Sequence, residues 1–395
     1  MKQGWEIKKL GEVCVIERGG SPRPINAFLT DMEDGINWIK IGDATPGSRY
    51  ITSTQEKIKP EGIKKSRMVY KGDFILSNSM SFGKPYILGI DGCIHDGWLV
   101  LRDNNNIFDK NFLYYYLTSP NIYQEFKRLA VGGVVNNLNS ELVRSVKVAI
   151  PPLPVQEQIV SELDLLSGII EKKREQLKEL DALAQSIFYD MFGDPITNEK
   201  GWEVKKLGEV CKVNPSKKDT SIGLSNSDIV SFLPMEDLPI KACYHSPKQT
   251  RLFSEVQSSY TCFANNDILM AKVTPCFENG KIGIASNLMN GIGYGSSEFI
   301  VIRANNIDVI KEYPYFVIQN TSFIENACAQ LTGTSGLRRV PRQYVENCNI
   351  SIPPLPLQRQ FATKIEAIEK QKELIKQSIS ETETLFNARM QEHFG

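Results

Sequence analysis

The sequence of 395 residues lacks the segments that would hold a protein in a membrane or carry it across one. No apolar run approaches the ~20 residues that a membrane-spanning helix needs. The first ten residues, MKQGWEIKKL, contain no apolar signal core. We therefore expect a cytoplasmic protein without a membrane association.

The sequence also has little of what metal and redox chemistry require. Its eight cysteines are never closer than 14 residues, the spacing of Cys262 and Cys276, so no CxxC pair can seed a zinc site or a redox couple. Cys14 and Cys211 stand at the same place in a repeat and are expected to be small buried apolar residues. Only three histidines occur, which argues weakly against chemistry based on imidazole.

Sequence motifs of the common enzyme classes are missing as well. FGKPY and NGKIG lack the upstream glycine and the Ser/Thr of a phosphate loop, and GIGYGSS lacks the final glycine of GxGxxG. The NPS at Asn214 and the DPI at Asp194 are not the [ND]PP[YF] cluster with which adenine methyltransferases hold a flipped base. We find no HExxH and no carboxylate cluster suited to a metal. Together these absences favour a binding protein over an enzyme.

The charge is balanced overall but not along the chain. Lys and Arg number 46, as do Asp and Glu, so the net charge of zero does not by itself indicate a nucleic-acid binder. Residues 1–150 hold 20 basic and 16 acidic side chains, whereas residues 151–200 hold 5 and 10. This distribution permits local basic grooves outside the acidic segment.

What the sequence does contain is a repeat of domain size. GWEIKKLGEVC at Gly4–Cys14 returns as GWEVKKLGEVC at Gly201–Cys211, and IPPLPVQEQ from Ile150 returns as IPPLPLQRQ from Ile352, 202 residues later. A period of about 200 residues is too long for a solenoid, whose units have roughly 20 to 50 residues. The chain also exceeds the roughly 250 to 300 residues at which single cores stop growing. Two domain-sized halves are predicted.

A long helix is predicted after each IPPLP. The first seam advances by alternating four and three residues, a heptad pattern, and the second follows the same plan less cleanly. Each helix would have about 38 residues, and the apolar stripes are expected to bury each other in an antiparallel pair. The seams comprise Ile159, Leu163, Leu166, Ile170, Leu177, Leu180, Ala184, Ile187 and Met191, and Phe361, Ile365, Ile368, Ile375, Ile379 and Phe386.

The predicted fold class is α+β. Strand patterns such as DFILSN, GWLVLR, DILMAKV and SEFIVIR alternate with short helices between the repeated ends. Two mixed α/β domains are then joined and spaced by the antiparallel coiled-coil helices, in a cyclic layout with pseudo-twofold symmetry. We place the first domain at residues 1–150, the central helix at 151–197, the second domain at 198–352 and the C-terminal helix at 353–395. The halves agree at their ends and diverge in the middle, which suggests one task performed on two objects.

These features together resemble the specificity subunit of type I restriction-modification enzymes over essentially the whole chain. IPPLPxQxQ before a long helix, present twice, is the specific signal, and WxxxxLGEV opening each half supports it. NDILMAKVTPCFENGKIGIA and GYGSSEFIVIR in the second half, and NWIKIGDA, SFGKPYI and HDGWLVLR in the first, look like two classes of target-recognition domain.

The resemblance implies a subunit without catalysis or a cofactor of its own. Each target-recognition domain would read one half of a bipartite site in double-stranded DNA. The helices would space the two halves and dock two modification subunits, which use S-adenosylmethionine to methylate adenine N6. Two ATP-driven restriction subunits can join, so ATP and Mg²⁺ are expected on partners.

Candidate DNA contacts follow predicted strands. A loop around Asn279-Gly280 could enter a groove, where Lys donates to guanine and Asn pairs with adenine, although a plain turn is the alternative. The residues chosen there are Lys272, Thr274, Asn279 and Lys281, and at the comparable place in the first half Asn78, Ser79, Ser81 and Lys84.

A second pair of candidates differs in type between the halves. Asn136-Asn137 fall opposite Arg338-Arg339 at the offset of 202. We consider that one frame carries exchangeable readers, Asn for adenine and Arg for guanine. The alternative is that the arginines hold phosphates and the asparagines are turn residues.

Other functions remain open at this point. One is the specificity subunit of a related multi-subunit system of type IIB kind. Another is a catalytic DNA methyltransferase, which binding of S-adenosylmethionine by the isolated chain would reveal. A third is a coiled-coil adaptor that contacts only proteins, which a sequence-specific gel shift of the complex would exclude.

Overall fold

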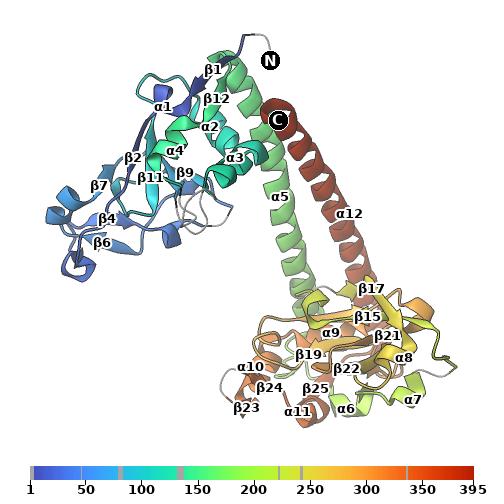
Figure 1. The fold of residues 1–395 in the computed structure, drawn as a ribbon. Coiled ribbons are helices and arrows are strands. Elements are labelled where there is room, and N and C mark those ends of the chain that lie inside the picture. Colours follow the sequence, from blue (N-terminus) through green and yellow to red (C-terminus); the bar gives the residue numbers. More distant parts are fainter. Residues whose placement is uncertain are drawn as a thin grey trace. The chain divides into compact units, whose positions relative to one another are not determined.

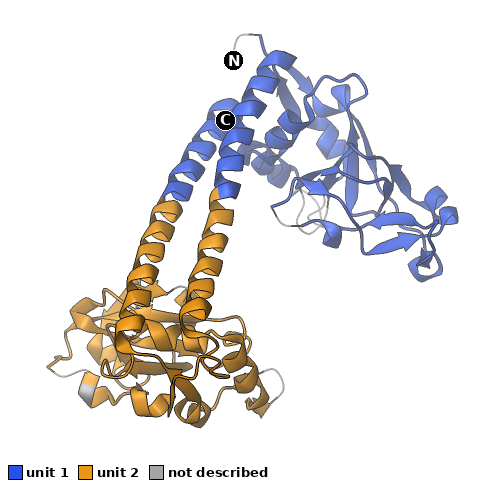
Figure 2. Ribbon diagram, turned by 180° about the vertical axis from the view of Figure 1, so that it is seen from behind, with its two compact units in different colours: residues 1–172, 378–395 blue, residues 173–377 orange. Residues whose placement is uncertain are grey.

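The computed structural model describes residues 4–45, 47–78, 83–130, 138–220, 223–240, 243–334 and 337–395, except for the side chain of residue 219 (Figure 1). The chain forms two compact units (Figure 2). Unit 1 comprises residues 1–172 and 378–395, and unit 2 comprises residues 173–377. No described helix is long and apolar enough to cross a membrane.

Unit 1 contains two five-stranded sheets. The first has the order β2-β11-β8-β9-β5, and the second has the order β3-β6-β4-β10-β7. The first sheet comprises β2 (Val15–Arg18), β11 (Trp98–Arg102), β8 (Phe74–Ser77), β9 (Pro85–Leu88) and β5 (Tyr50–Ile51). The second comprises β3 (Leu29–Thr30), β6 (Glu56–Ile58), β4 (Ile36–Ile39), β10 (Gly92–Ile94) and β7 (Arg67–Val69). Apart from the long helices, the other strands and α-helices of unit 1 are β1 (Glu6–Lys9), α1 (Leu10–Val13), α2 (Lys110–Thr118), α3 (Pro120–Ala130), α4 (Ser140–Ser145) and β12 (Lys147–Ile150).

Unit 2 repeats this plan. Its first sheet, in the order β14-β22-β19-β20-β16, comprises β14 (Cys211–Val213), β22 (Phe299–Ala304), β19 (Ile268–Ala271), β20 (Ile282–Ala285) and β16 (Tyr244–His245). The second, β17-β15-β21-β18, comprises β17 (Gln249–Leu252), β15 (Ile229–Leu233), β21 (Ile292–Gly295) and β18 (Thr261–Ala264). The remaining elements are β13 (Glu203–Lys206), α6 (Leu207–Val210), α7 (Lys217–Thr220), α8 (Phe253–Val256), α9 (Glu312–Ile318), α10 (Thr321–Ala329), β23 (Thr332–Thr334), β24 (Leu337–Arg339), α11 (Arg342–Asn347) and β25 (Asn349–Ile352).

The interiors of the two halves therefore share a scaffold although their sequences differ. In both first sheets the same five strands follow one another in the same order, and in both units two of the second-sheet strands, β4 with β10 and β15 with β21, pair in parallel. The repeated opening strand lies antiparallel to the strand that precedes the long helix, β1 on β12 and β13 on β25. The divergence seen in the sequence lies mainly in side chains and loops, and the described second sheet of unit 1 has one more strand, β3, than that of unit 2.

Two long helices, α5 (Leu153–Phe192) and α12 (Leu355–Phe394), each begin in one unit and end in the other. Within unit 1, Arg389 Nε and His393 Nε2 lie 2.8 and 3.1 Å from the Glu162 carboxylate. Within unit 2, Lys372 Nζ lies 2.7 Å from Asp181 Oδ1. Because the earlier residue of α5 pairs with the later residue of α12, the helices run antiparallel and lie side by side within each unit (Figures 1 and 2).

The expected α+β fold with an antiparallel helix pair is thus confirmed. The predicted apolar seam is buried in part, with Leu163 inaccessible in unit 1 and Phe361 and Ile365 inaccessible in unit 2. Seven further residues of the seam are only half-buried, namely Leu177, Leu180, Ile187, Met191, Ile375, Ile379 and Phe386. Helix α5 ends before Gly193, whose φ of +74° is the left-handed conformation that favours glycine after a helix. The compact units divide both helices near their middle, whereas the sequence assigns each helix to a segment of its own. That four-segment division stays a prediction.

The repeated glutamine of IPPLPxQ explains why the corner recurs. The Gln156 side-chain amide donates to the carbonyl oxygens of Ile107 and Pro151, at 3.0 and 2.9 Å, and its Oε1 accepts from the Asp109 N–H at 2.9 Å. Gln358 makes the matching set with Asp308, Pro353 and Ile310. Both side chains are fully buried, so each satisfies backbone groups that water cannot reach where a domain meets its helix.

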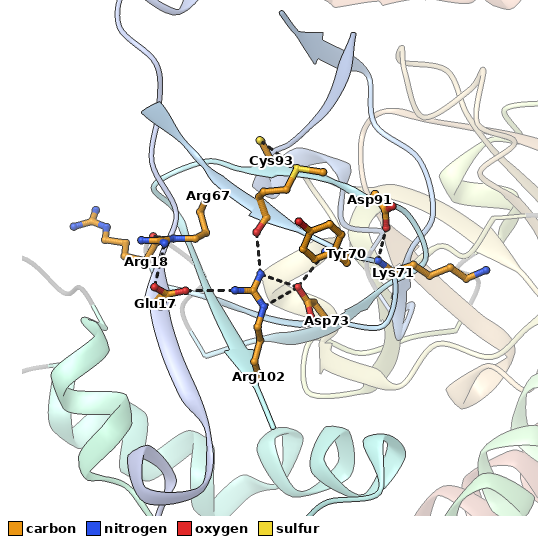
Figure 3. A network of polar contacts seen from close by, with 10 residues as sticks. Glu17, Arg18, Arg67, Tyr70, Lys71, Asp73, Asp91, Cys93 and Arg102 are labelled. Carbon is orange, nitrogen blue, oxygen red and sulfur yellow. Dashed lines mark hydrogen bonds and ion pairs between the residues drawn. The ribbon is translucent and has the colours of Figure 1, made fainter. Parts of the chain in front are cut away.

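In the first sheet of each unit, an arginine on one strand is hydrogen-bonded to an aspartate just before the neighbouring strand. Arg102 on β11 donates to Asp73 Oδ2 from Nε and Nη2 at 3.1 and 2.9 Å, and its Nη1 reaches Glu17 at 3.4 Å (Figure 3). In unit 2, Arg303 on β22 makes two bonds to Asp267, at 2.6 and 2.7 Å. Both aspartates directly precede the central strand of the sheet, β8 or β19. These ion pairs therefore fix the N-terminal end of that strand.

Candidate nucleic-acid interface

Three loops meet at the far end of the central strand of unit 2. Lys272 follows β19, and its N–H donates to the Glu298 carbonyl oxygen at 2.9 Å, just before β22. Its own carbonyl oxygen accepts from the Val340 N–H at 2.8 Å, and its ammonium donates to the Ser297 carbonyl oxygen at 2.9 Å. One residue therefore ties together the described residues of 272–281, 296–298 and 332–340, which we call the loop end of unit 2.

Unit 1 builds the same junction around Asn78, which follows β8. The Asn78 N–H donates to the Gly97 carbonyl oxygen at 3.0 Å, and its carbonyl oxygen accepts from the Leu138 N–H at 2.9 Å. The Asn78 side-chain amide donates to the Asp96 carbonyl oxygen at 3.0 Å. These three bonds correspond one by one to those of Lys272. The described residues 78, 83–84, 95–97 and 138 form the loop end of unit 1.

In unit 2 the structure brings the two predicted groups of candidates together. The Thr274 N–H donates to the Arg338 carbonyl oxygen at 2.9 Å, and the Arg338 N–H donates to Thr274 Oγ1 at 3.2 Å. Val273 and Arg339 form an isolated antiparallel bridge. The loop after β19 and the hairpin β23–β24 thus form one surface, although about 60 residues separate them in sequence.

The loop itself is not the two-residue hairpin turn that Asn279-Gly280 favours. Ten residues, 272–281, connect β19 to β20, and the Asn279 N–H donates to the Pro275 carbonyl oxygen at 3.0 Å. Gly280 has a φ of +72°, so the predicted glycine conformation is present. Asn279 is exposed, whereas the Lys281 ammonium donates to the Met235 carbonyl oxygen at 2.8 Å and anchors the loop.

The two arginines of the hairpin differ in freedom. Arg339 donates to both carboxylate oxygens of Glu298, at 2.8 to 3.2 Å, and the Lys272 ammonium lies 3.9 Å from the same carboxylate. The hydrogen bonds from Arg339 lower the pKa of Glu298, with the charges of Lys272 and Arg339 adding to the effect against its burial. The Arg338 side chain is 51% exposed and only 4.0 Å from Glu278. Arg338 is therefore more exposed than Arg339, whose side chain is 38% exposed, and it is less firmly held.

Replacing Glu298 by Gln is expected to destabilise unit 2 slightly at pH 7 and not at all in acid. A carboxylate with a lowered pKa stabilises the fold above its unfolded-state pKa of about 4.3, and this stabilisation is lost as the pH falls through the lower folded-state value. Urea midpoints of the wild type and Glu298→Gln should therefore differ at pH 7 and converge in acid, below the lowered pKa of Glu298. Glu346→Gln, in an exposed pair with Arg342, is the control. A difference that persists in acid would show that the carboxylate charge does not latch the hairpin.

The predicted candidates of unit 1 are only partly described. Ser79, Ser81, Asn136 and Asn137 lie outside the described residues. Lys84 is exposed, beside Ser77 at the end of β8. Asn78 is 1% exposed, so its side chain holds loops in place. The same holds for the Lys272 ammonium of unit 2, bonded to a backbone carbonyl.

Two arginines that were not predicted from the sequence lie beside the loop end of unit 1. Arg18 Nε donates to the Asp96 carbonyl oxygen at 3.0 Å, and Ser21 Oγ donates to Asp96 Oδ1 at 2.8 Å. Arg23 lies 3.9 Å from the same carboxylate, and its side chain is largely exposed. All three belong to ERGGSPRP, where two arginines among glycines and prolines indicate an exposed basic loop. That composition was the available signal.

Among the described residues no group of three or more His, Cys, Asp or Glu side chains could hold a metal ion. Burial raises the pKa of the Cys14 and Cys211 thiols to about 12, so both remain protonated and unreactive. Their expected role as small buried residues is confirmed.

The family follows from comparison with known proteins. A family model described as "Type I restriction modification DNA specificity domain" matches residues 2–181 and 199–384. The chain belongs to this family. The two matched segments correspond to the two halves of the repeat, so the type I specificity domain occurs twice here.

Relatives within the type I specificity family cover different shares of the chain. The type I restriction enzyme EcoAI specificity subunit of Escherichia coli is 34% identical over 200 residues, 50% of this chain and 33% of that protein. The type I restriction enzyme MjaIX specificity subunit of Methanocaldococcus jannaschii is 20% identical over 385 residues, 92% of this chain and 86% of that protein. The alignments with the E. coli relatives span about a third of their length.

Solved structures share the fold of this specificity-family chain. One, from a study of complex assembly and conformational transition of the type I R-M system, covers 100% of this chain and 98% of its own, with a TM-score of 0.59 and 17% identity. The type I restriction-modification S subunit from M. genitalium covers 99% and 96%, with a TM-score of 0.54 and 11% identity. At these identities the likeness concerns the fold alone.

Proposed function

We propose that this chain is the DNA-recognition subunit of a type I restriction-modification enzyme and has no catalytic activity itself. The observation that carries the proposal is the loop end, built twice on one hydrogen-bonded scaffold with different side chains around it. A shared frame with different surface residues suits two readers of two different half-sites. The subunit would act in the cytoplasm on double-stranded DNA, and it would need no cofactor of its own.

Partners would supply the chemistry. Two modification subunits with S-adenosylmethionine, and two restriction subunits with ATP and Mg²⁺, are the proposed assembly. Support for a partner present in two copies comes from exposed residues that recur in both halves. Ile7 and Val204 on the repeated strand, and Leu183 and Leu385 on the helices, are apolar and half-exposed at matching positions. A surface that is kept twice while the interiors diverge suits two copies of one protein.

The test is sequencing of the adenines that the reconstituted complex methylates. We expect a bipartite site with two unlike halves, and no methylation by the chain alone. A complex that methylates a single continuous sequence, or a chain that methylates unaided, would contradict the proposal.

Within that experiment, Arg338→Ala is expected to relax specificity at one base pair of one half-site. A side chain that reads guanine in the major groove contributes about 1 to 3 kcal/mol of discrimination, so the preference should fall roughly 5- to 150-fold. The measurement is the methylation rate on DNA substituted at each position in turn. Arg342→Ala, an exposed arginine paired with Glu346, should change no position. A uniform loss at all positions would instead assign Arg338 to a phosphate.

A further inference from the structure

A charged network joins the first recognition sheet to the spacer helix in unit 1. Arg49 directly precedes the edge strand β5, and its carbonyl oxygen accepts from the Ile87 N–H of β9 at 2.9 Å. Its guanidinium leaves the sheet and donates to Asn111 Oδ1 at 2.8 Å and to the Tyr115 hydroxyl at 2.7 Å, both on α2. It also donates to Asp164 Oδ1 on α5 at 2.8 Å. One side chain thus contacts the sheet, the covering helix and the spacer.

The network is closed, and its cation is more buried than its carboxylate, since the Asp164 side chain is 40% exposed. The Tyr115 hydroxyl donates to the same Asp164 oxygen at 2.6 Å, and the guanidinium carbon lies 4.9 and 4.8 Å from the ring centres of Tyr114 and Tyr115. The Arg49 side chain is 18% exposed. The guanidinium is planar and forked, and it is held by three hydrogen-bond acceptors and two aromatic rings. Because its donors must stay in one plane, these contacts fix the orientation of the sheet on α5 as well as its distance.

Apolar residues also pack this joint, since Ile159 and Leu163 of α5 share a hydrophobic cluster with Phe112 of α2. A cavity of about 510 Å³ opens beside Arg49 and is also lined by Ser167 and Glu171 of α5 and by Phe386 and Met390 of α12. Side chains that face a cavity have no packed neighbours there to resist a rotation. At this place the polar network therefore adds a directional constraint to the apolar packing.

In the matching joint of unit 2 a cysteine takes the place of Arg49, and the charged groups beside it, Lys372, Asp181 and Glu369, all belong to the two long helices. Cys243 precedes β16 as Arg49 precedes β5, and its carbonyl oxygen accepts from the Ile284 N–H at 2.8 Å. Cys243 is buried in one hydrophobic cluster with Ala184, Tyr315 and Phe361. The corresponding cavity measures about 170 Å³. In both units apolar packing holds the first sheet on the long helices, and in unit 1 the Arg49 network adds hydrogen bonds from the sheet to α5.

We propose that Arg49 is a positioning residue that sets the gap between the two half-sites by fixing the first recognition domain on α5. This inference rests on the proposed function, since a gap exists only for a bipartite target. The loop end of unit 1 lies at the end of β8. Strand β9 and the edge strand β5 connect β8 to Arg49 within the same sheet. A rotation at the joint moves those loops by an amount that grows with their distance from it. Loss of the network therefore lets the protein accept a wider range of gaps between the half-sites. The loops proposed to read bases stay unaltered.

The experiment uses the full chain with its modification subunits and a series of DNA duplexes. These keep both half-sites and vary the gap from two base pairs below to two above the natural length. For Arg49→Met we expect the ratio of kcat/KM on the natural gap to that on a gap changed by one base pair to fall by about tenfold, since a charge-assisted network is lost. The bases preferred at each half-site stay unchanged. Arg49→Lys keeps the charge but not the fork and should recover part of the ratio.

A control and a double variant separate positioning from folding. Arg128→Met removes an exposed arginine paired with Glu125 in the same unit and should leave the gap profile unchanged. Arg49→Met with Asp164→Leu replaces both charges by apolar groups, so thermal stability should return while the gap ratio stays low. The proposal is overturned if soluble Arg49→Met keeps the wild-type gap ratio, or if the double variant restores the ratio together with stability. A wild-type complex without any bipartite target would instead refute the proposed function.

Discussion

Removing seven residues from each spacer helix, Glu171–Leu177 from α5 and Glu373–Ile379 from α12, is expected to shorten the gap in the DNA target by up to about three base pairs. Seven residues are ~10 Å of helix at 1.5 Å per residue, and B-DNA advances ~3.4 Å per base pair. A whole heptad keeps the apolar seam in phase, so the pair should still form. Tilt of the helices relative to the DNA would reduce the change. Both half-site sequences should survive, as sequencing of methylated adenines would show.

The structure makes the paired deletion the sharper test, because the units hold the helices in register at two places. Glu162 pairs with Arg389 in unit 1, and Asp181 pairs with Lys372 in unit 2. These contacts lie 19 residues apart on α5 (181 − 162) and 17 apart on α12 (389 − 372). A deletion in α5 alone leaves 12 against 17, so both pairs cannot form and stability should fall. If the paired deletion folds and leaves the gap untouched, spacing belongs to the partner subunits.

Asp267→Ala is expected to lower the free energy of unfolding of unit 2 by roughly 2 kcal/mol, because it removes a buried carboxylate that accepts charge-assisted hydrogen bonds. The Asp267 side chain is 1% exposed and accepts two bonds from Arg303 and one from the Ala264 N–H. The change also frees the near end of β19, on which the loop end is built. Urea unfolding, followed by tryptophan fluorescence and circular dichroism, would measure it.

The matched control for this variant is Glu346→Ala, which removes the carboxylate of the exposed pair with Arg342. Exposed pairs contribute about 0 to 1 kcal/mol, so little change is expected. Equal effects of the two substitutions would mean that burial of Asp267 does not determine how much its ion pair with Arg303 stabilises the fold.

Much of the fold was predictable because its signals are local. Heptad spacing predicted α5 and α12, and the prolines and Gly193 placed their ends, since these residues act on the backbone where they stand. The repeated strings predicted two like units. The role of Gln156 and Gln358 was not predictable, because their partners at Ile107 and Asp308 lie about 50 residues away in sequence.

That the chosen loops bind DNA stays a prediction, and the structure shows only which of the chosen side chains are already bonded within the protein. Thr274, Asn279 and Arg338 were chosen by residue type and do lie on one surface. The Lys272 ammonium was chosen on the same grounds, yet it donates to a backbone carbonyl. Residue type states what a side chain can bond, whereas its neighbours in space determine what it does bond.

By itself the sequence determined that this protein has two related halves, two long pairing helices and no motif of a common enzyme class, because periodicity, repetition and motif spacing are properties of neighbouring residues. Only the tertiary structure decided which polar groups are occupied. Burial and long-range hydrogen bonds put Asn78 and Lys272 into the scaffold, clamped Arg339 on Glu298 and left Arg338 exposed. The same long-range contacts brought Arg49 onto Asp164, 115 residues away. Such pairings depend on the complete packing of the domain, which no local pattern contains.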